Sequence, residues 1–182
     1  MAPEVSEQRF TASNTLCPRT HLWHATDAMA PETEVADFMY ALVRLLKPGL
    51  VLETGCYLGF TALKMAQALK ENGYGRLVTC DIEERYVSEL NVRSEDLPLE
   101  AFRTSGVELL ARFESIDLAF IDSGGDREKE VRQAARRMGR FGVIVLHDTA
   151  PSQTESGIPK SVGLPHLYMN TPRGLTLFQV GD

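Results

Sequence analysis

The stretch Val51–Leu63 constrains the fold of this chain more than any other. An apolar run ends on the carboxylate of Glu53, a loop containing Gly55 and Gly59 follows, and an amphipathic helix then begins. Glycine has no Cβ, so both loop positions can turn tightly and lie close to a ligand. A strand, a glycine-containing loop and a helix in this order are typical of α/β proteins with parallel sheets. We therefore predict an α/β fold with a ligand-binding loop after this strand.

The alternation of strands and helices continues along the chain. Apolar residues at i, i+3 and i+4 predict helices at Glu34–Lys47, Ala62–Leu69, Glu83–Asn91, Val107–Phe113 and Val131–Met138. Apolar runs predict strands at Leu50–Glu53, Leu77–Cys80, Leu99–Arg103, Ile116–Asp122 and Gly142–Asp148, with a last strand at Leu175–Val180. This rhythm predicts a Rossmann-like, doubly wound, mostly parallel sheet with an antiparallel C-terminal edge strand.

The composition fits one globular domain. With 182 residues, 43% of them hydrophobic, the chain is long enough for a single well-buried domain spanning residues 1–182. The net charge of -6 offers no basic field to a nucleic acid, so no nucleic-acid partner is expected. No apolar run approaches the roughly 18 residues that a membrane span needs, so no membrane partner is expected.

The termini and cysteines predict an intracellular protein. The three cysteines form no C-x-x-C pair, which argues against a disulfide framework, and the N-terminus has no signal-peptide pattern. We therefore expect a cytoplasmic location. His21 and His24 flank Trp23 in an irregular N-terminal segment, residues 1–30, which we expect to act as a lid or as the contact of a homodimer.

Polar residues stand at the carboxyl ends of the predicted strands, where α/β sheets bind ligands. They are Glu53, Asp81, Asp122, His147 and Asp148. A carboxylate at the first strand end repels phosphate but suits the ammonium and sulfonium charges of S-adenosyl-L-methionine. Asp81 is placed to accept hydrogen bonds from ribose hydroxyls. The alternative to a cofactor-binding loop after Glu53 is an ordinary strand-to-helix connection. The glycine spacing differs from G-x-G-x-x-G, which disfavours an NAD-dependent oxidoreductase.

The same strand ends carry the candidate catalytic groups. Asp122 and Asp148 are able to hold Mg²⁺ between them, although either is equally consistent with a structural cap. His147 is either a general base beside the methyl group or a histidine packed at a strand end. Ser105 and Gly106 either contact the adenine ring or cap a helix.

The segment Val51–Leu69 resembles the first motif of the catechol and caffeoyl-CoA type of class I O-methyltransferases. Phe120–Asp122 and Leu146–Thr149 resemble bacterial small-molecule O-methyltransferases that modify sugars and macrolides. The similarity extends over about Met29–Thr149. It implies ribose binding at Asp81, a metal at Asp122 and Asp148, and a pocket for the methionine part of the cofactor at Glu53, Gly55, Tyr57, Gly59 and Thr61, with Asp122 also beside the cofactor.

Two departures from the catechol type bear on the chemistry. Thr149 stands where that type has an asparagine metal ligand, and the segment Ser123–Asp126 lacks its lysine. We predict an S-adenosylmethionine-dependent O-methyltransferase acting on a hydroxyl of a small metabolite, a phenol, a sugar or a natural product. The alternative is a protein that binds the cofactor on the same fold but has other chemistry or lost activity.

Overall fold

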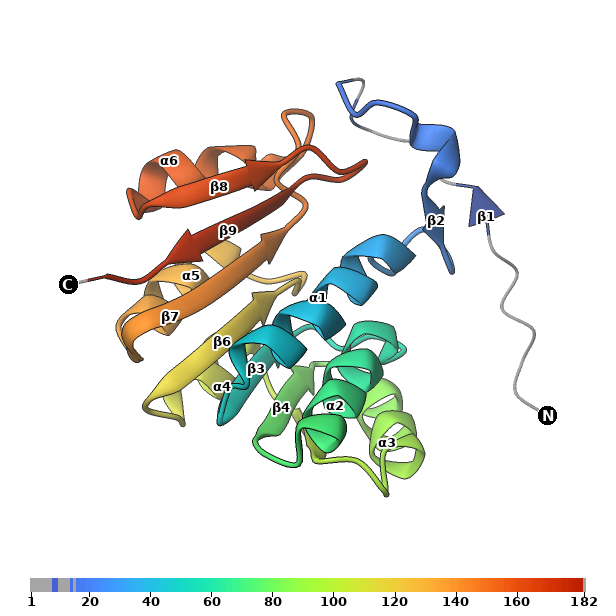
Figure 1. Ribbon diagram of the computed structural model, residues 1–182, viewed down its shortest axis with the longest axis vertical. Coiled ribbons are helices and arrows are strands. Elements are labelled where there is room, and N and C mark those ends of the chain that lie inside the picture. Colours follow the sequence, from blue (N-terminus) through green and yellow to red (C-terminus); the bar gives the residue numbers. More distant parts are fainter. Residues whose placement is uncertain (1–7, 10–13, 15, 182) are drawn as a thin grey trace.

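A seven-stranded sheet forms the centre of the molecule (Figure 1). The computed structural model describes residues 8–9, 14 and 16–181. The sheet consists of β3 (Leu50–Thr54), β4 (Arg76–Asp81), β5 (Leu99–Arg103), β6 (Ile116–Ile121), β7 (Met138–His147), β8 (His166–Met169) and β9 (Leu175–Gln179). Their spatial order is β5-β4-β3-β6-β7-β9-β8. Strands β3 to β7 pair in parallel, whereas β9 is antiparallel to both of its neighbours.

Helices cover both faces of the sheet (Figure 1). One face carries α1 (Thr33–Leu46), α2 (Phe60–Asn72) and α3 (Glu84–Arg93), and the other carries α4 (Gly106–Ala111), α5 (Arg127–Ala135) and α6 (Ile158–Val162). Short 3-10 turns, η1 (Thr20–Leu22) and η2 (Thr154–Gly157), lie in the connections. Near the N-terminus β1 (Gln8–Arg9) pairs antiparallel with β2 (His24–Ala25). In the described part of the chain, no helix combines the length and apolarity needed to cross a bilayer.

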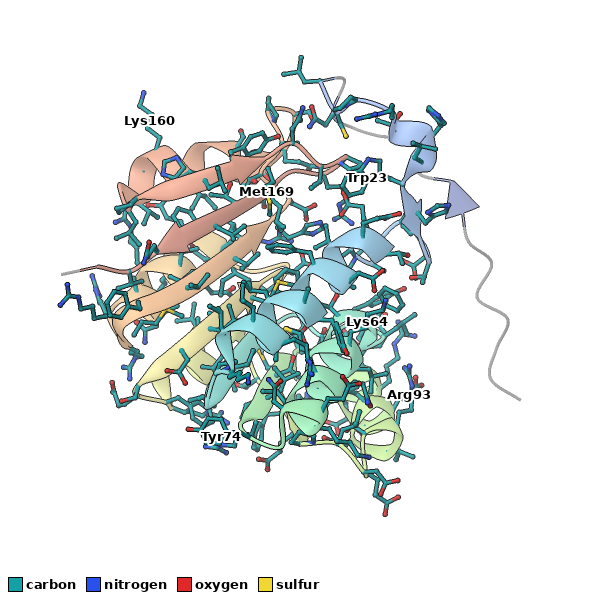
Figure 2. The ribbon with its side chains drawn as sticks, in the orientation of Figure 1. Trp23, Lys64, Tyr74, Arg93, Lys160 and Met169 are labelled. Atoms are coloured by element: carbon teal, nitrogen blue, oxygen red, sulfur yellow. The ribbon has the colours of Figure 1, made fainter. Side chains whose placement is uncertain are left out.

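Two hydrophobic cores follow from the two-residue period of the strands. Successive side chains of a strand point to opposite faces, so Val51 packs with α1 and α2, whereas Leu52 packs with α4 and α5. The side chains fill the layers between the sheet and its helices (Figure 2). Because both faces are covered, the central strands are mostly apolar, as their near-continuous apolar runs predicted.

The predicted fold class is confirmed, with one correction at the sheet edge. The last strand, β9, is antiparallel, but it lies inside the sheet, and β8 forms the edge. No strand was predicted between Asp148 and Leu175, where β8 lies. Leu167 and Tyr168 are exposed there, so this short edge strand lacks the buried apolar pattern that identifies a strand from sequence.

The chain reverses its direction of winding beside β3. From β3 it moves outward through β4 to β5, and it then returns to β6 on the other side of β3. The loops after β3 and β6 therefore separate, which leaves a crevice at the carboxyl end of the sheet. Of the predicted polar strand-end residues, Glu53, Asp81 and Asp122 meet at this crevice.

Candidate functional site

The loop after β3 is pinned between its two neighbouring strands. Gly55 has a φ of +83° and its amide donates to the carbonyl of Cys80 at 3.0 Å. A Cβ at Gly55 would lie 2.7 Å from the carbonyl oxygen of Asp122, so only glycine fits. The amide of Tyr57, which also has a positive φ of 44°, donates to the Asp81 carboxylate at 3.0 Å. The loop is thus a rigid floor for a ligand.

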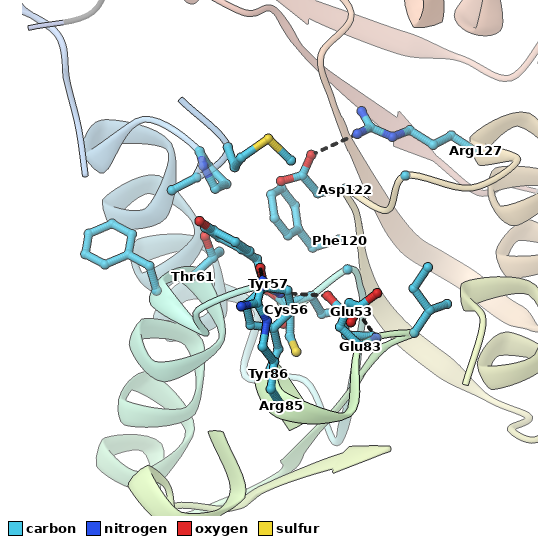
Figure 3. A pocket seen from close by; sticks show the side chains of 18 of the residues that line it. Glu53, Cys56, Tyr57, Thr61, Glu83, Arg85, Tyr86, Phe120, Asp122 and Arg127 are labelled. Atoms are coloured by element: carbon cyan, nitrogen blue, oxygen red, sulfur yellow. Dashed lines mark hydrogen bonds and ion pairs between the residues drawn. The ribbon is translucent and has the colours of Figure 1, made fainter. Parts of the chain in front are cut away.

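A pocket of about 540 Å³ opens above this loop (Figure 3). Its wall contains Glu53, Gly55, Tyr57, Thr61, Asp81 and Asp122, all predicted to contact the cofactor. The other lining residues are Met29, Ala30, Pro31, Cys56, Phe60, Ile82, Glu83, Arg85, Tyr86, Phe120, Gly124, Arg127 and Arg173. The Thr61 hydroxyl in this wall is buried and has no hydrogen-bond partner among the described residues. An unpaired polar atom at this position is free to bind a ligand.

Glu53 is a buried carboxyl group that a cation would stabilise. Its side chain accepts a hydrogen bond from the Thr79 hydroxyl at 2.6 Å. Burial, and then the charges of Asp122 and Asp81, raise the pKa of Glu53 to about 8. A positively charged ligand group beside Glu53 would offset burial and favour the carboxylate.

Asp81 is held by backbone amides at the end of β4. One carboxylate oxygen accepts from the amide of Tyr57 and the other accepts from the amide of Glu83, each at 3.0 Å. Each carboxylate oxygen can accept a second hydrogen bond. The fixed carboxylate is therefore preorganised to accept from two neighbouring hydroxyl groups of a ligand.

His147 does not face the pocket as a free base. It is fully buried, and its Nδ1 and Nε2 lie 3.0 Å from Asp122 and 2.7 Å from Glu32. Burial alone would lower the pKa of His147, but the adjacent carboxylates, Asp122 foremost, raise it to about 10. His147 is thus an imidazolium with both N–H groups donated. This geometry is at odds with the general-base hypothesis and agrees with the packed-histidine alternative.

Two arginines engage the carboxylates that were predicted to bind a metal. Arg127 donates to Asp148 at 2.9 Å and lies 3.4 Å from Asp122. Arg173 forms a two-point contact with both oxygens of Asp148, at 2.5 and 2.9 Å. One side-chain ligand atom from each of Asp122, His147 and Asp148 lies within 4.8 Å of the others, which is compact enough for a metal.

Two of the three candidate ligands, Asp148 and His147, have no unengaged donor atom for Mg²⁺. Both oxygens of Asp148 and both nitrogens of His147 already have protein partners. The hydroxyl of Thr149 is bonded to Thr176 at 2.9 Å, and so it does not take the place of the asparagine ligand. Mg²⁺ requires unengaged carboxylate oxygens together with open positions for water and substrate.

Three predicted cofactor residues lie outside the pocket wall. Gly59 immediately precedes α2 with a φ of +76°, and a Cβ there would lie 2.5 Å from the side chain of Leu90, so it has a structural role. Ser105 accepts from the amide of Glu108 in a capping box, which agrees with the helix-cap alternative. A Cβ on Gly106 would lie 2.2 Å from the carboxylate of Glu130. The adenine contact proposed for Ser105 and Gly106 is thus not supported.

The sequence did not single out Arg127, Arg173 or Glu32 as site residues. Glu32 accepts from His147, 115 positions away, and from the amide of Arg173. Arg173 also donates to the carbonyl of Ala30 at 3.2 Å, so it fixes the N-terminal segment over the pocket. Of these three residues, only Arg127 has a sequence position that could have indicated a site residue, because it follows the strand end at Asp122 closely.

The fold and the crevice define an α/β protein with a cofactor-type site, and comparisons identify its family. A family model described as a methyltransferase domain matches residues 52–149, more than half of the chain. The chain therefore belongs to this methyltransferase family. A second model, described as O-methyltransferase, matches residues 6–94. A search of curated proteins found no match.

Solved structures share the fold at low sequence identity. The O-methyltransferase TomG from Streptomyces achromogenes, in complex with SAM, has a TM-score of 0.70 and 18% identity, with 85% of this chain and 82% of that chain covered. An O-methyltransferase from Bacillus cereus in complex with SAH has a TM-score of 0.71 and 18% identity, covering 85% and 84%. The SAH-bound methyltransferase PaMTH1 from Podospora anserina has a TM-score of 0.67 and 18% identity, covering 81% and 78%. The fold is thus that of class I O-methyltransferases.

Proposed function

We propose that this protein is an S-adenosylmethionine-dependent O-methyltransferase whose cofactor occupies the pocket above the β3 loop. The observation that carries the proposal is the convergence of Glu53, Tyr57, Thr61 and Asp81 on one pocket wall in a chain of the methyltransferase family. The structural neighbours with SAM or SAH bound support the same cofactor.

Each of these residues has a role that suits the cofactor's chemistry. Glu53 faces a site for positive charge, and the fixed carboxylate of Asp81 suits the two ribose hydroxyls. The unpartnered Thr61 hydroxyl is a further hydrogen-bonding group for the methionine part. Tyr57 and Tyr86 stack edge to face at 4.9 Å, forming an aromatic side of the same wall.

The cofactor supplies the methyl group: an oxygen lone pair of the acceptor forms the new O–CH₃ bond while the S–CH₃ bond breaks and its electron pair returns to sulfur. Positioning of the acceptor contributes most to such a displacement. Of the three predicted catalytic residues, Asp122 alone lies in the pocket wall. We assign Asp122 to accept the proton of the acceptor hydroxyl, and His147 and Asp148 to positioning behind Asp122.

The acceptor is a small molecule in this proposal. The pocket wall offers Met29, Phe60 and Phe120 as apolar surfaces beside Asp122, a combination suited to a compact hydroxylated compound. The net charge of -6 gives no general attraction for nucleic acids.

The test is methyl transfer from S-adenosylmethionine with a labelled methyl group to a panel of small phenols, carboxylic acids and sugars. We expect label in at least one acceptor and a loss of about 100-fold in kcat for Asp122→Asn. Asp117→Asn serves as a control, because Asp117 accepts from the amides of Gly49 and Leu50 at the opposite end of the sheet. Equal rates for both variants would remove Asp122 from the mechanism, and absence of transfer to every acceptor would contradict the proposal.

A further inference from the structure

Buried carboxylates beside and behind the pocket already have protein partners. Glu32, Asp122 and Asp148 are engaged by the guanidinium groups of Arg127 and Arg173 and by the ring nitrogens of His147. The side chains of Arg127 and Arg173 are only 10% and 15% exposed, and Asp148 is 8% exposed. A divalent cation would have to displace these guanidinium groups or lie beside them in a poorly solvated region, where an uncompensated positive charge is strongly unfavourable.

Arg127 is the cation of this set with a donor left for a ligand. Its Nε donates to the carbonyl of Ser123, and its Nη1 donates to Asp148 and to the carbonyl of His147. Its Nη2 has only the 3.4 Å ion pair with Asp122 among the described residues, and Arg127 lies in the pocket wall. Figure 3 shows the guanidinium next to Asp122. Arg173, in contrast, uses its donors on Asp148 and on the backbone of the N-terminal segment.

We propose that Arg127, held by Asp148 and braced by Arg173, takes the place of a catalytic metal ion, so that methyl transfer is metal-independent and the acceptor oxygen binds at Nη2 of Arg127. The inference rests on the proposed function. A guanidinium supplies a permanent positive charge and directed N–H groups, which suit an oxyanion.

The class of acceptor follows from the use of a guanidinium group in place of a metal ion. A metal ion coordinates an oxygen directly and strongly lowers the pKa of its proton, whereas a guanidinium only donates hydrogen bonds to it. The acceptor must therefore be acidic in its own right, a phenol or a carboxylic acid rather than a sugar alcohol. A carboxylic acid binds already ionised, whereas a phenol gives its proton to the neighbouring Asp122 carboxylate. Methyl transfer from the sulfonium then leaves a neutral ether or ester and a neutral thioether.

Manganese binding tests the inference without relying on activity. We expect the electron paramagnetic resonance signal of free Mn²⁺ to be unchanged by wild-type protein. Arg127→Met removes the guanidinium group that pairs with Asp122 and Asp148, so this variant is expected to bind Mn²⁺. Arg132→Met is the matched control, since Arg132 lies on the same helix but pairs with Glu128 at the surface, and it should behave as wild type.

Activity completes the test. Transfer by the wild type should be unaffected by a chelator, should favour phenols or carboxylic acids over sugars, and should fall about 100-fold in Arg127→Met. One Mn²⁺ bound per wild-type chain, with transfer abolished by chelator, would overturn the inference. Titration of the same samples with S-adenosylhomocysteine separates the two proposals. If the wild type binds both S-adenosylhomocysteine and Mn²⁺, only the inference of metal-independent transfer is contradicted. If S-adenosylhomocysteine does not bind, the proposed cofactor itself is contradicted.

Discussion

At the scale of single residues, Glu53 links cofactor binding to protonation. Its burial raises its pKa to about 8, and a cofactor that carries positive charge favours the ionised form. Below that pH the protein must therefore release a proton when the cofactor binds. Binding then competes with protonation of Glu53.

This linkage predicts a pH-dependent affinity for S-adenosylmethionine. From about pH 6 to about pH 8 the dissociation constant should fall about tenfold per pH unit, and it should level off at higher pH. Glu53→Gln should bind more weakly and lose the dependence. Calorimetric titrations in buffers of different ionisation enthalpy report both the affinity and the proton released. An affinity that is constant over this range in the wild type would show that Glu53 is already ionised in the free protein.

The element that most directly shapes the pocket is the loop between β3 and α2. Its path depends on Gly55, where both the positive φ and the approach of the Asp122 carbonyl exclude a side chain. Gly73 offers a matched comparison, because it has a φ of +65° and a Cβ added there would have nothing within 4 Å of it.

Alanine substitution at these two glycines should separate the cost of a positive φ from the cost of a steric clash. Gly73→Ala should cost about 1–2 kcal/mol of unfolding free energy, since only the left-handed backbone conformation is penalised. Gly55→Ala should cost more and should also weaken binding of S-adenosylhomocysteine, because the loop must move away from Asp122. Urea denaturation and calorimetry measure the two effects. Equal losses of stability with binding unchanged in both variants would mean that the loop adapts to a Cβ.

The N-terminal segment was expected to be a lid or a dimer contact, and its hydrogen bonds to Arg173 favour the lid hypothesis. Arg173 connects Asp148 to the carbonyls of Met29 and Ala30, and both of these residues line the pocket. Trp23 lies beside the start of α1 (Figure 2), where it lines a surface pocket with Glu34 and Asn170.

We predict that Arg173→Gln loosens this segment. Removing one partner of a buried ion pair costs about 3–5 kcal/mol, so the melting temperature should fall. Limited proteolysis should then cut between residues 18 and 30 sooner than in the wild type, and S-adenosylhomocysteine should dissociate faster. Arg132→Gln, which breaks a surface pair on α5, is the control and should change none of these three quantities. Unchanged proteolysis in Arg173→Gln would argue against a tied lid.

At the scale of the whole molecule, the sheet was predictable because its central strands are buried on both faces. Their apolar runs are continuous, and each ends on the polar residue that forms part of the site, as Glu53, Asp81 and Asp122 do. The edge strand β8 carries no such run, and its identity depends on pairing with β9.

The charge network was not predictable from local pattern. Arg173 meets Asp148 from 25 positions away, and Glu32 meets His147 from 115 positions away. Neither spacing has a sequence signature, since such pairs form only when the sheet and α1 bring them together. The sequence therefore suggested a metal site at Asp122 and Asp148, whereas in the structure both carboxylates form ion pairs with arginines.

The central claim, a methyl-donor site rather than a dinucleotide site, is tested most directly by calorimetric titration of the wild type with S-adenosylhomocysteine and, separately, with NAD. The account predicts saturable binding of S-adenosylhomocysteine at one site per chain, weakened in Glu53→Gln, and no saturable heat with NAD. Preferential binding of NAD would contradict it.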